Sequence, residues 1–97
     1  MIPTFKTNFE FYYDEDTMDL PQNVLESHLS DAAKNIYIFI VYFITENVSD
    51  VIGLLKATEE SKHDFEAGFA QLLENGLLLK EEDGENTHYI VTKEFKN

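Results

Sequence analysis

Nine consecutive apolar residues, Ile36 to Ile44, stand in the middle of a chain that is otherwise strongly acidic. The run is too short to cross a bilayer, because a membrane-spanning helix needs about 20 apolar residues. Lys34 and Glu46 bound the run closely, and two of its nine residues are Tyr. We therefore expect the run to form a buried core element rather than a membrane anchor.

The remaining composition is that of one folded domain. The chain has 97 residues, of which 43% are hydrophobic and 13% aromatic, enough for a modest core. The absence of Cys excludes disulfides, thiolate metal sites and a cysteine nucleophile. Residues 1–11 carry Lys6 and Glu10 and lack a long apolar stretch, so they do not form a secretory signal. We expect a cytoplasmic protein.

Charge is distributed unevenly along the chain. Seven Lys, no Arg and nineteen Asp and Glu give a formal net charge of −12. Residues 1–30 carry −5, residues 31–58 carry −1 and residues 59–97 carry −6. This balance counts against simple phosphate binding, which depends on Lys and Arg.

The first 29 residues are expected to form a strand and an acidic loop that pack on the rest of the domain. Aromatic side chains recur at odd positions, which is typical of a strand with one apolar face: Phe5, Phe9, Phe11 and Tyr13. A loop is expected from Asp14 to Ser30, with a turn of helix after Pro21, since Pro suits the first helical position.

Residues 31 to 46 are predicted to form a helix, although β-branched and aromatic residues alone favour a strand. Ser30 offers a hydroxyl cap, and Asp31 places an acid at the positive end of the helix dipole. Such a helix is apolar nearly all round and must be covered on more than one side. The cover is either the aromatic face of the N-terminal strand or a second copy of the chain in a homodimer.

The last part of the chain predicts two helices and a hairpin. Ser49 and Asp50 begin a helix that ends near residues 56–58. The segment Ser61–Asp64 has the form of a capping box and opens a helix that Asn75–Gly76 ends. The apolar face of this helix is formed by Phe65, Phe69, Leu72 and Leu73. Residues 77–80 and 88–92 read as strands, with a turn at Asp83–Gly84.

This order of elements resembles a winged helix-turn-helix. Residues 49–55 resemble its second helix, and Ser61–Glu74 resemble its recognition helix. The passage Leu73-Glu74-Asn75-Gly76-Leu77-Leu78 resembles the one by which many such domains enter their wing. The chain is similar in this to MarR-like regulators and to the N-terminal domains of DnaD-like replication proteins. The resemblance implies an α+β fold in which residues 30–97 form three helices and a C-terminal hairpin wing, beside the added N-terminal strand.

Winged helices serve both DNA binding and protein binding. The resemblance places Lys62, His63, Glu66 and Gln71 on the surface of the recognition helix. Residues 80–85, in the wing, carry a net charge of −3. Acids that face phosphate add repulsion where a DNA-binding protein supplies attraction. A dimeric DNA-binding regulator of transcription or replication is therefore the second hypothesis rather than the first.

Two acidic clusters are the candidate partner-binding residues. One comprises Asp14, Glu15, Asp16 and Asp19, and the other Glu81, Glu82, Asp83 and Glu85. They form either solvated loops or a surface that binds a basic protein. The first hypothesis is a non-enzymatic module that regulates a nucleic-acid-handling protein, for example as an inhibitor that imitates nucleic acid. In size and charge the chain resembles small acidic inhibitors of phages and mobile elements, including some anti-CRISPR proteins. A structural subunit of a larger assembly is the third hypothesis.

No constellation of residues predicts an enzyme, a cofactor or a metal site. His28, His63 and His88 lack the spacing of a helical metal pair. The loop that holds Asp14 and Asp16 lacks the central Gly and the closing Glu of an EF-hand.

Overall fold

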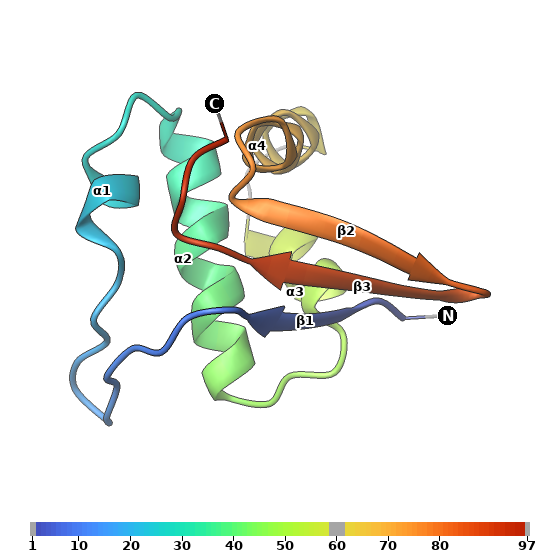
Figure 1. The fold of residues 1–97 in the computed structure, drawn as a ribbon, viewed down its shortest axis with the longest axis horizontal. Helices are drawn as coiled ribbons and strands as arrows, with labels where there is room; N and C mark the ends of the chain where they lie inside the picture. Colours follow the sequence, from blue (N-terminus) through green and yellow to red (C-terminus); the bar gives the residue numbers. More distant parts are fainter. Residues whose placement is uncertain (1, 59–61, 97) are drawn as a thin grey trace.

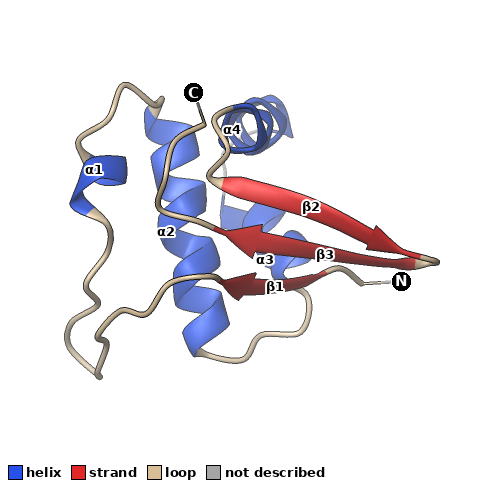
Figure 2. Cartoon of the chain, viewed as in Figure 1, coloured by secondary structure: helices blue, strands red, loops and turns tan. Residues whose placement is uncertain are grey.

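The computed structural model describes residues 2–58 and 62–96, which form an α+β fold with four helices and one three-stranded mixed sheet (Figures 1 and 2). The predicted α+β class is confirmed. The elements are β1 (Thr4–Thr7), α1 (Gln22–Leu25), α2 (Asp31–Thr45), α3 (Val51–Thr58), α4 (Lys62–Glu74), β2 (Leu78–Asp83) and β3 (Asn86–Val91). No helix within these residues is long and apolar enough to cross a membrane.

The sheet joins the two ends of the chain, with strand order β1-β3-β2. Strands β2 and β3 form an antiparallel hairpin, and Gly84 in its turn has a φ of +64°. Strand β1 pairs with β3 in parallel, and Phe5 stacks on Tyr89 with 4.8 Å between the ring centroids. The N-terminal strand is therefore part of the same sheet as the hairpin (Figure 2).

The N-terminal strand is shorter than its aromatic alternation predicts. It ends at Thr7, which pairs with Val91, the last residue of β3, so no strand remains beside the chain after that point. Phe9 and Phe11 still pack against the core, whereas Tyr13 is 52% exposed. The prediction that Tyr13 belongs to an apolar strand face is therefore wrong.

Helix α2 is the centre of the core and confirms the predicted helix to within one residue. Its N-terminus is capped as expected, since the Ser30 hydroxyl accepts a hydrogen bond of 3.1 Å from the Ala33 N–H. It buries Ala33, Ile36, Tyr37, Ile40, Val41 and Phe43. These side chains are covered by β1, α3 and α4 of the same chain. Within the apolar run, Tyr42 alone has an exposed side chain.

Two helices complete the layer beside α2. Asp50 begins α3 as predicted, because its carboxylate accepts a hydrogen bond of 3.0 Å from the Gly53 N–H. Helix α4 turns its predicted apolar face to the core, where the rings of Phe69 and Tyr89 are perpendicular, with 5.4 Å between their centroids. Ser61, the hydroxyl of the predicted capping box, lies outside the described residues.

The passage from α4 into β2 follows the expected glycine-terminated geometry. Gly76 has a φ of +77°, the left-handed region that Gly adopts without strain. The Leu77 N–H donates to the Leu72 carbonyl at 3.0 Å, which satisfies one of the last carbonyls of the helix. The buried Thr92 hydroxyl donates to the Gly76 carbonyl at 2.7 Å, so the turn is tied to the end of β3.

Residues 8–30 wrap around the outer side of α2 (Figure 1). The helical turn expected after Pro21 is present as α1, with Pro21 at the N-cap position rather than inside the helix. Val24 of α1 is fully buried. The N-terminal segment therefore contributes to the same core as residues 30–97.

Candidate functional site

The two predicted acidic clusters lie at opposite ends of the long axis of the molecule (Figure 1). We name them the acidic loop, residues 12–19, and the acidic hairpin end, residues 81–86. All eight predicted partner-binding acids are exposed. The structure does not bring the clusters together, so one small partner surface does not cover both.

The acidic hairpin end projects beyond the helices at the far end of the sheet. Side chains alternate along a strand, so Glu81 and Asp83 lie on one face of β2 and Glu82 on the other. Lys80 contacts Glu82 at 3.3 Å, and both side chains are about half exposed or more. An ion pair so open to solvent contributes little to stability. Because Lys80 offsets the charge of Glu82, the net negative charge of this end comes from Glu81, Asp83 and Glu85.

Asp14 organises the acidic loop. One of its carboxylate oxygens accepts hydrogen bonds from the Asp16 N–H, the Thr17 N–H and the Thr17 hydroxyl at 2.8, 2.8 and 2.9 Å. The other oxygen accepts a hydrogen bond of 2.6 Å from the Tyr12 hydroxyl. The Tyr12 hydroxyl and these N–H groups hold the pKa of Asp14 well below its usual range, and the same bond raises the pKa of Tyr12. Asp14 is thus occupied in shaping the loop.

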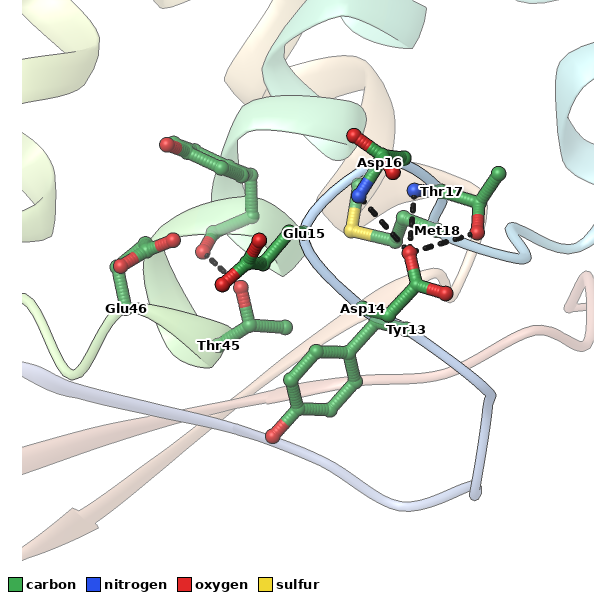
Figure 3. A pocket seen from close by; sticks show the side chains of 9 residues that line it. Tyr13, Asp14, Glu15, Asp16, Thr17, Met18, Thr45 and Glu46 are labelled. Carbon is green, nitrogen blue, oxygen red and sulfur yellow. Dashed lines mark hydrogen bonds between the residues drawn. The ribbon is translucent and has the colours of Figure 1, made fainter.

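A hollow of ≈ 480 Å³ lies between the acidic loop and the C-terminal end of α2 (Figure 3). Its lining comes from two segments far apart in the sequence, residues 13–18 and the last turn of α2. Tyr42, Thr45 and Glu46 face the hollow from the helix side. Figure 3 places the Glu15 carboxylate on the side of the loop toward Thr45 and Glu46. Carboxylates and aromatic rings therefore share one concave surface.

Sequence reasoning missed the helix side of this hollow. Tyr42 was expected to be buried with the rest of the apolar run, but it is 45% exposed. Helical periodicity could have revealed it, because the polar side of α2 follows a helical spacing that includes Tyr42: Asp31, Asn35, Tyr42 and Glu46. Tyr42 belongs to that polar side by its position in the helix.

The residues predicted on the surface of the recognition helix all belong to α4. His63 and Glu66 are exposed as predicted, and Lys62 is the first residue of the helix. Gln71, expected on the same surface, is half-buried, and its side-chain oxygen accepts a hydrogen bond of 2.8 Å from the Ser30 N–H. Gln71 therefore lies only partly on the helix surface, and its side-chain oxygen ties α4 to the start of α2.

Several lysines are engaged within the chain. Lys56 lies over the ring of Phe65, with 5.8 Å between its Nζ and the ring centroid. Lys93 lies over Phe9 at 5.9 Å in the same way. Lys80 contacts Glu82 within the acidic hairpin end, and Lys93 lines a shallow hollow with Asp19 at the base of the acidic loop.

The acids do not form a metal site within residues 2–58 and 62–96, where no group of three or more His, Asp or Glu could hold an ion. Asp14 in particular already accepts hydrogen bonds at both carboxylate oxygens. Comparisons with protein-family models, with curated proteins and with solved structures find no match for this chain.

Proposed function

We propose that this protein is a non-enzymatic interaction module whose acidic surface binds a basic, nucleic-acid-handling protein and inhibits it. The observation that carries the proposal is the exposure of all eight acids of the two clusters. No Lys or Arg occurs in residues 12–19, and Lys80 beside the hairpin cluster offsets one of its four acids, so both clusters keep a net negative charge. Fields of this sign attract basic proteins over distances set by the Debye length, about 8 Å at physiological salt.

We further propose that residues 30–97 form a winged helix. The order α2-α3-α4-β2-β3 and the direct passage from α4 through Gly76 into the hairpin support this assignment. In a DNA-binding winged helix, the recognition helix and the hairpin supply basic and amide side chains. Here the corresponding surfaces carry Glu66 and the acidic hairpin end, which repel phosphate. The fold would thus serve protein binding in this chain.

Inhibition follows from competition for the same basic groups. A protein that binds nucleic acid presents Lys and Arg to phosphates and releases counterions when they meet. Exposed carboxylates on a projecting hairpin offer those Lys and Arg an alternative set of anions. The expected partner surface is therefore a nucleic-acid groove in a cytoplasmic protein.

Affinity capture with the tagged full-length chain, with and without nuclease, tests the proposal. The hairpin triple removes three charges: Glu81→Gln, Asp83→Asn and Glu85→Gln. The loop triple leaves Asp14 intact: Glu15→Gln, Asp16→Asn and Asp19→Asn. The control triple changes exposed acids outside both clusters: Glu10→Gln, Glu26→Gln and Glu94→Gln.

The expected result is a basic nucleic-acid-binding protein that survives nuclease treatment. It should be lost with the hairpin triple or the loop triple and retained with the control triple. All three variants remove the same charge, so a difference between them would show that the location of the acids matters. Recovery of DNA or RNA whose associated proteins disappear with nuclease would overturn the proposal in favour of the DNA-binding regulator. Equal loss with the control triple would show that net charge alone, rather than a site, explains the capture.

A further inference from the structure

The hollow between the acidic loop and α2 exposes aromatic surface that the core does not use. Tyr13 is 52% exposed and Tyr42 is 45% exposed, and Met18 is a third member of the lining. Tyr and Met are the side chains that interfaces favour at their centres, because they bury large apolar area with few polar atoms. The concave shape and the exposed rings indicate a docking site.

Charge identifies the class of occupant. Glu15, Asp16 and Glu46 line the same hollow, and no Lys is among its lining residues. Carboxylates beside an apolar wall act across less water than carboxylates on an open surface, so their attraction for a cation is stronger. An anionic or purely apolar occupant would leave these acids uncompensated. The hollow is therefore complementary to a positively charged group with an apolar body.

The loop side of the hollow is held in place without a ligand. The four hydrogen bonds accepted by Asp14 fix residues 14–17, and Tyr13 pairs with Met18 in a short antiparallel bridge. The Asp19 N–H also donates to the Tyr12 carbonyl at 2.8 Å, which closes the base of the loop. A site that is already shaped loses less conformational entropy on binding.

We propose that this hollow takes an arginine side chain from an extended basic segment of the partner, an inference that rests on the proposed function. A guanidinium stacks on aromatic rings, and here Tyr13 and Tyr42 supply them. Its fork of N–H donors matches carboxylates, and here Glu15 and Glu46 supply those from opposite sides. A lysine ammonium is compact and strongly hydrated, so it matches the rings less well.

A titration followed by amide chemical shifts tests this inference with defined probes. The probes are short Gly- and Ser-based peptides that carry arginine, lysine or citrulline at the same positions, since citrulline keeps the shape of arginine without its charge. The arginine peptide should shift the amides of residues 13–18 and 42–46 of the full chain. It should bind about tenfold more tightly than the citrulline peptide, and more tightly than the lysine peptide.

Variants separate the hollow from general acidity. Tyr42→Ala and Glu46→Gln should each weaken arginine-peptide binding several-fold. The matched controls are Leu79→Ala, which removes another exposed apolar side chain, and the hairpin triple, which removes charge at the other end of the molecule. Both controls should leave the shifts at the hollow unchanged. Tyr42 and Glu46 are exposed, and the dispersion of the amide spectrum verifies that each variant is folded.

Two results would overturn the inference and leave the proposed function in place. One is a set of shifts confined to the acidic hairpin end and abolished by the hairpin triple. The other is equal binding of the arginine and citrulline peptides at the hollow. The capture experiment with nuclease tests the proposed function separately, because it does not depend on which acidic cluster meets the partner.

Discussion

Asp14 illustrates how far a single residue could be understood from the sequence. Its place in an acidic cluster predicted a partner-binding carboxylate, whereas the structure engages both of its oxygens within residues 12–17. Asp often accepts hydrogen bonds from the backbone two or three residues ahead, so an Asx-type turn was foreseeable from its position. The bond from Tyr12 was not foreseeable, because it depends on the path that the chain takes through the loop.

The pH dependence of the loop follows from the lowered pKa of Asp14. A carboxyl group whose pKa is lower in the folded state stabilises the fold above its unfolded value of about 3.9. That stabilisation is lost as the pH falls from about 4 through the folded pKa. The side-chain carboxyl carbon shift of Asp14 should therefore begin to change only well below pH 4. A midpoint near 3.9 would contradict this assignment, and Asp14→Asn should abolish the transition.

Tyr37 is buried on α2, and its hydroxyl donates to the Thr92 carbonyl at 2.8 Å. Tyr37→Phe removes this donor and leaves the carbonyl without it, so the free energy of unfolding should fall by about 1 kcal/mol. Urea denaturation measures the change. Tyr42→Phe is the matched control, since its exposed ring should give no change. Equal effects of the two substitutions would show that the buried hydrogen bond adds nothing.

At the scale of elements, local sequence signals predicted the ends of helices better than the pairing of strands. The caps Ser30 and Asp50 and the left-handed Gly76 marked helix ends that the structure confirms. The predicted length of the N-terminal strand was wrong. Alternation of apolar residues reports burial, and Phe9 and Phe11 are still partly buried after β1 has ended. Strand β1 ends at Thr7, which pairs with the last residue of β3. This register joins the two ends of the chain, so the alternation of residues within one segment does not predict it.

The crossing of α2 and α4 depends on Gly68. A Cβ at this position would lie 2.7 Å from Ile36 Cδ1 and 3.1 Å from the Ala33 backbone nitrogen, so the helices would have to separate. Gly68→Ala should therefore lower the free energy of unfolding by roughly 1–3 kcal/mol, although Ala favours helix over Gly. Ala67→Gly on the exposed face is the control for helix propensity and should cost about 1 kcal/mol. A stabilising effect of Gly68→Ala would contradict the close approach described here.

At the scale of the whole molecule, the sequence predicted the acidic clusters but not their separation. Their sequence positions, near residues 14 and 83, contain no information on distance, and only the assembled sheet places them at opposite ends. The expected homodimer through residues 31–46 stays a prediction. Most apolar side chains of α2 are covered within the chain, which leaves Tyr42 as its exposed aromatic residue. The hollow could not be foreseen, because its two sides come from distant segments.

The acidic surface makes the association with a basic partner sensitive to salt. Raising the salt concentration shortens the Debye length from about 10 Å at 0.1 M to about 3 Å at 1 M, so long-range attraction is lost. The association rate of the captured partner should fall steeply with salt, while its dissociation rate changes less. The hairpin triple should flatten this dependence, and the control triple should preserve more of it. An association rate that is independent of salt would contradict electrostatic attraction by the clusters.

Competition with nucleic acid for the partner is the most direct test of the proposed inhibition. The captured partner is titrated with a labelled DNA or RNA duplex at about 0.15 M salt, with and without this protein. We expect the protein to displace the duplex from the partner and the loop triple or the hairpin triple to do so poorly. The protein alone should leave the duplex unbound. Undiminished duplex binding at saturating protein, or tight binding of the duplex by the protein itself, would contradict the proposed inhibition.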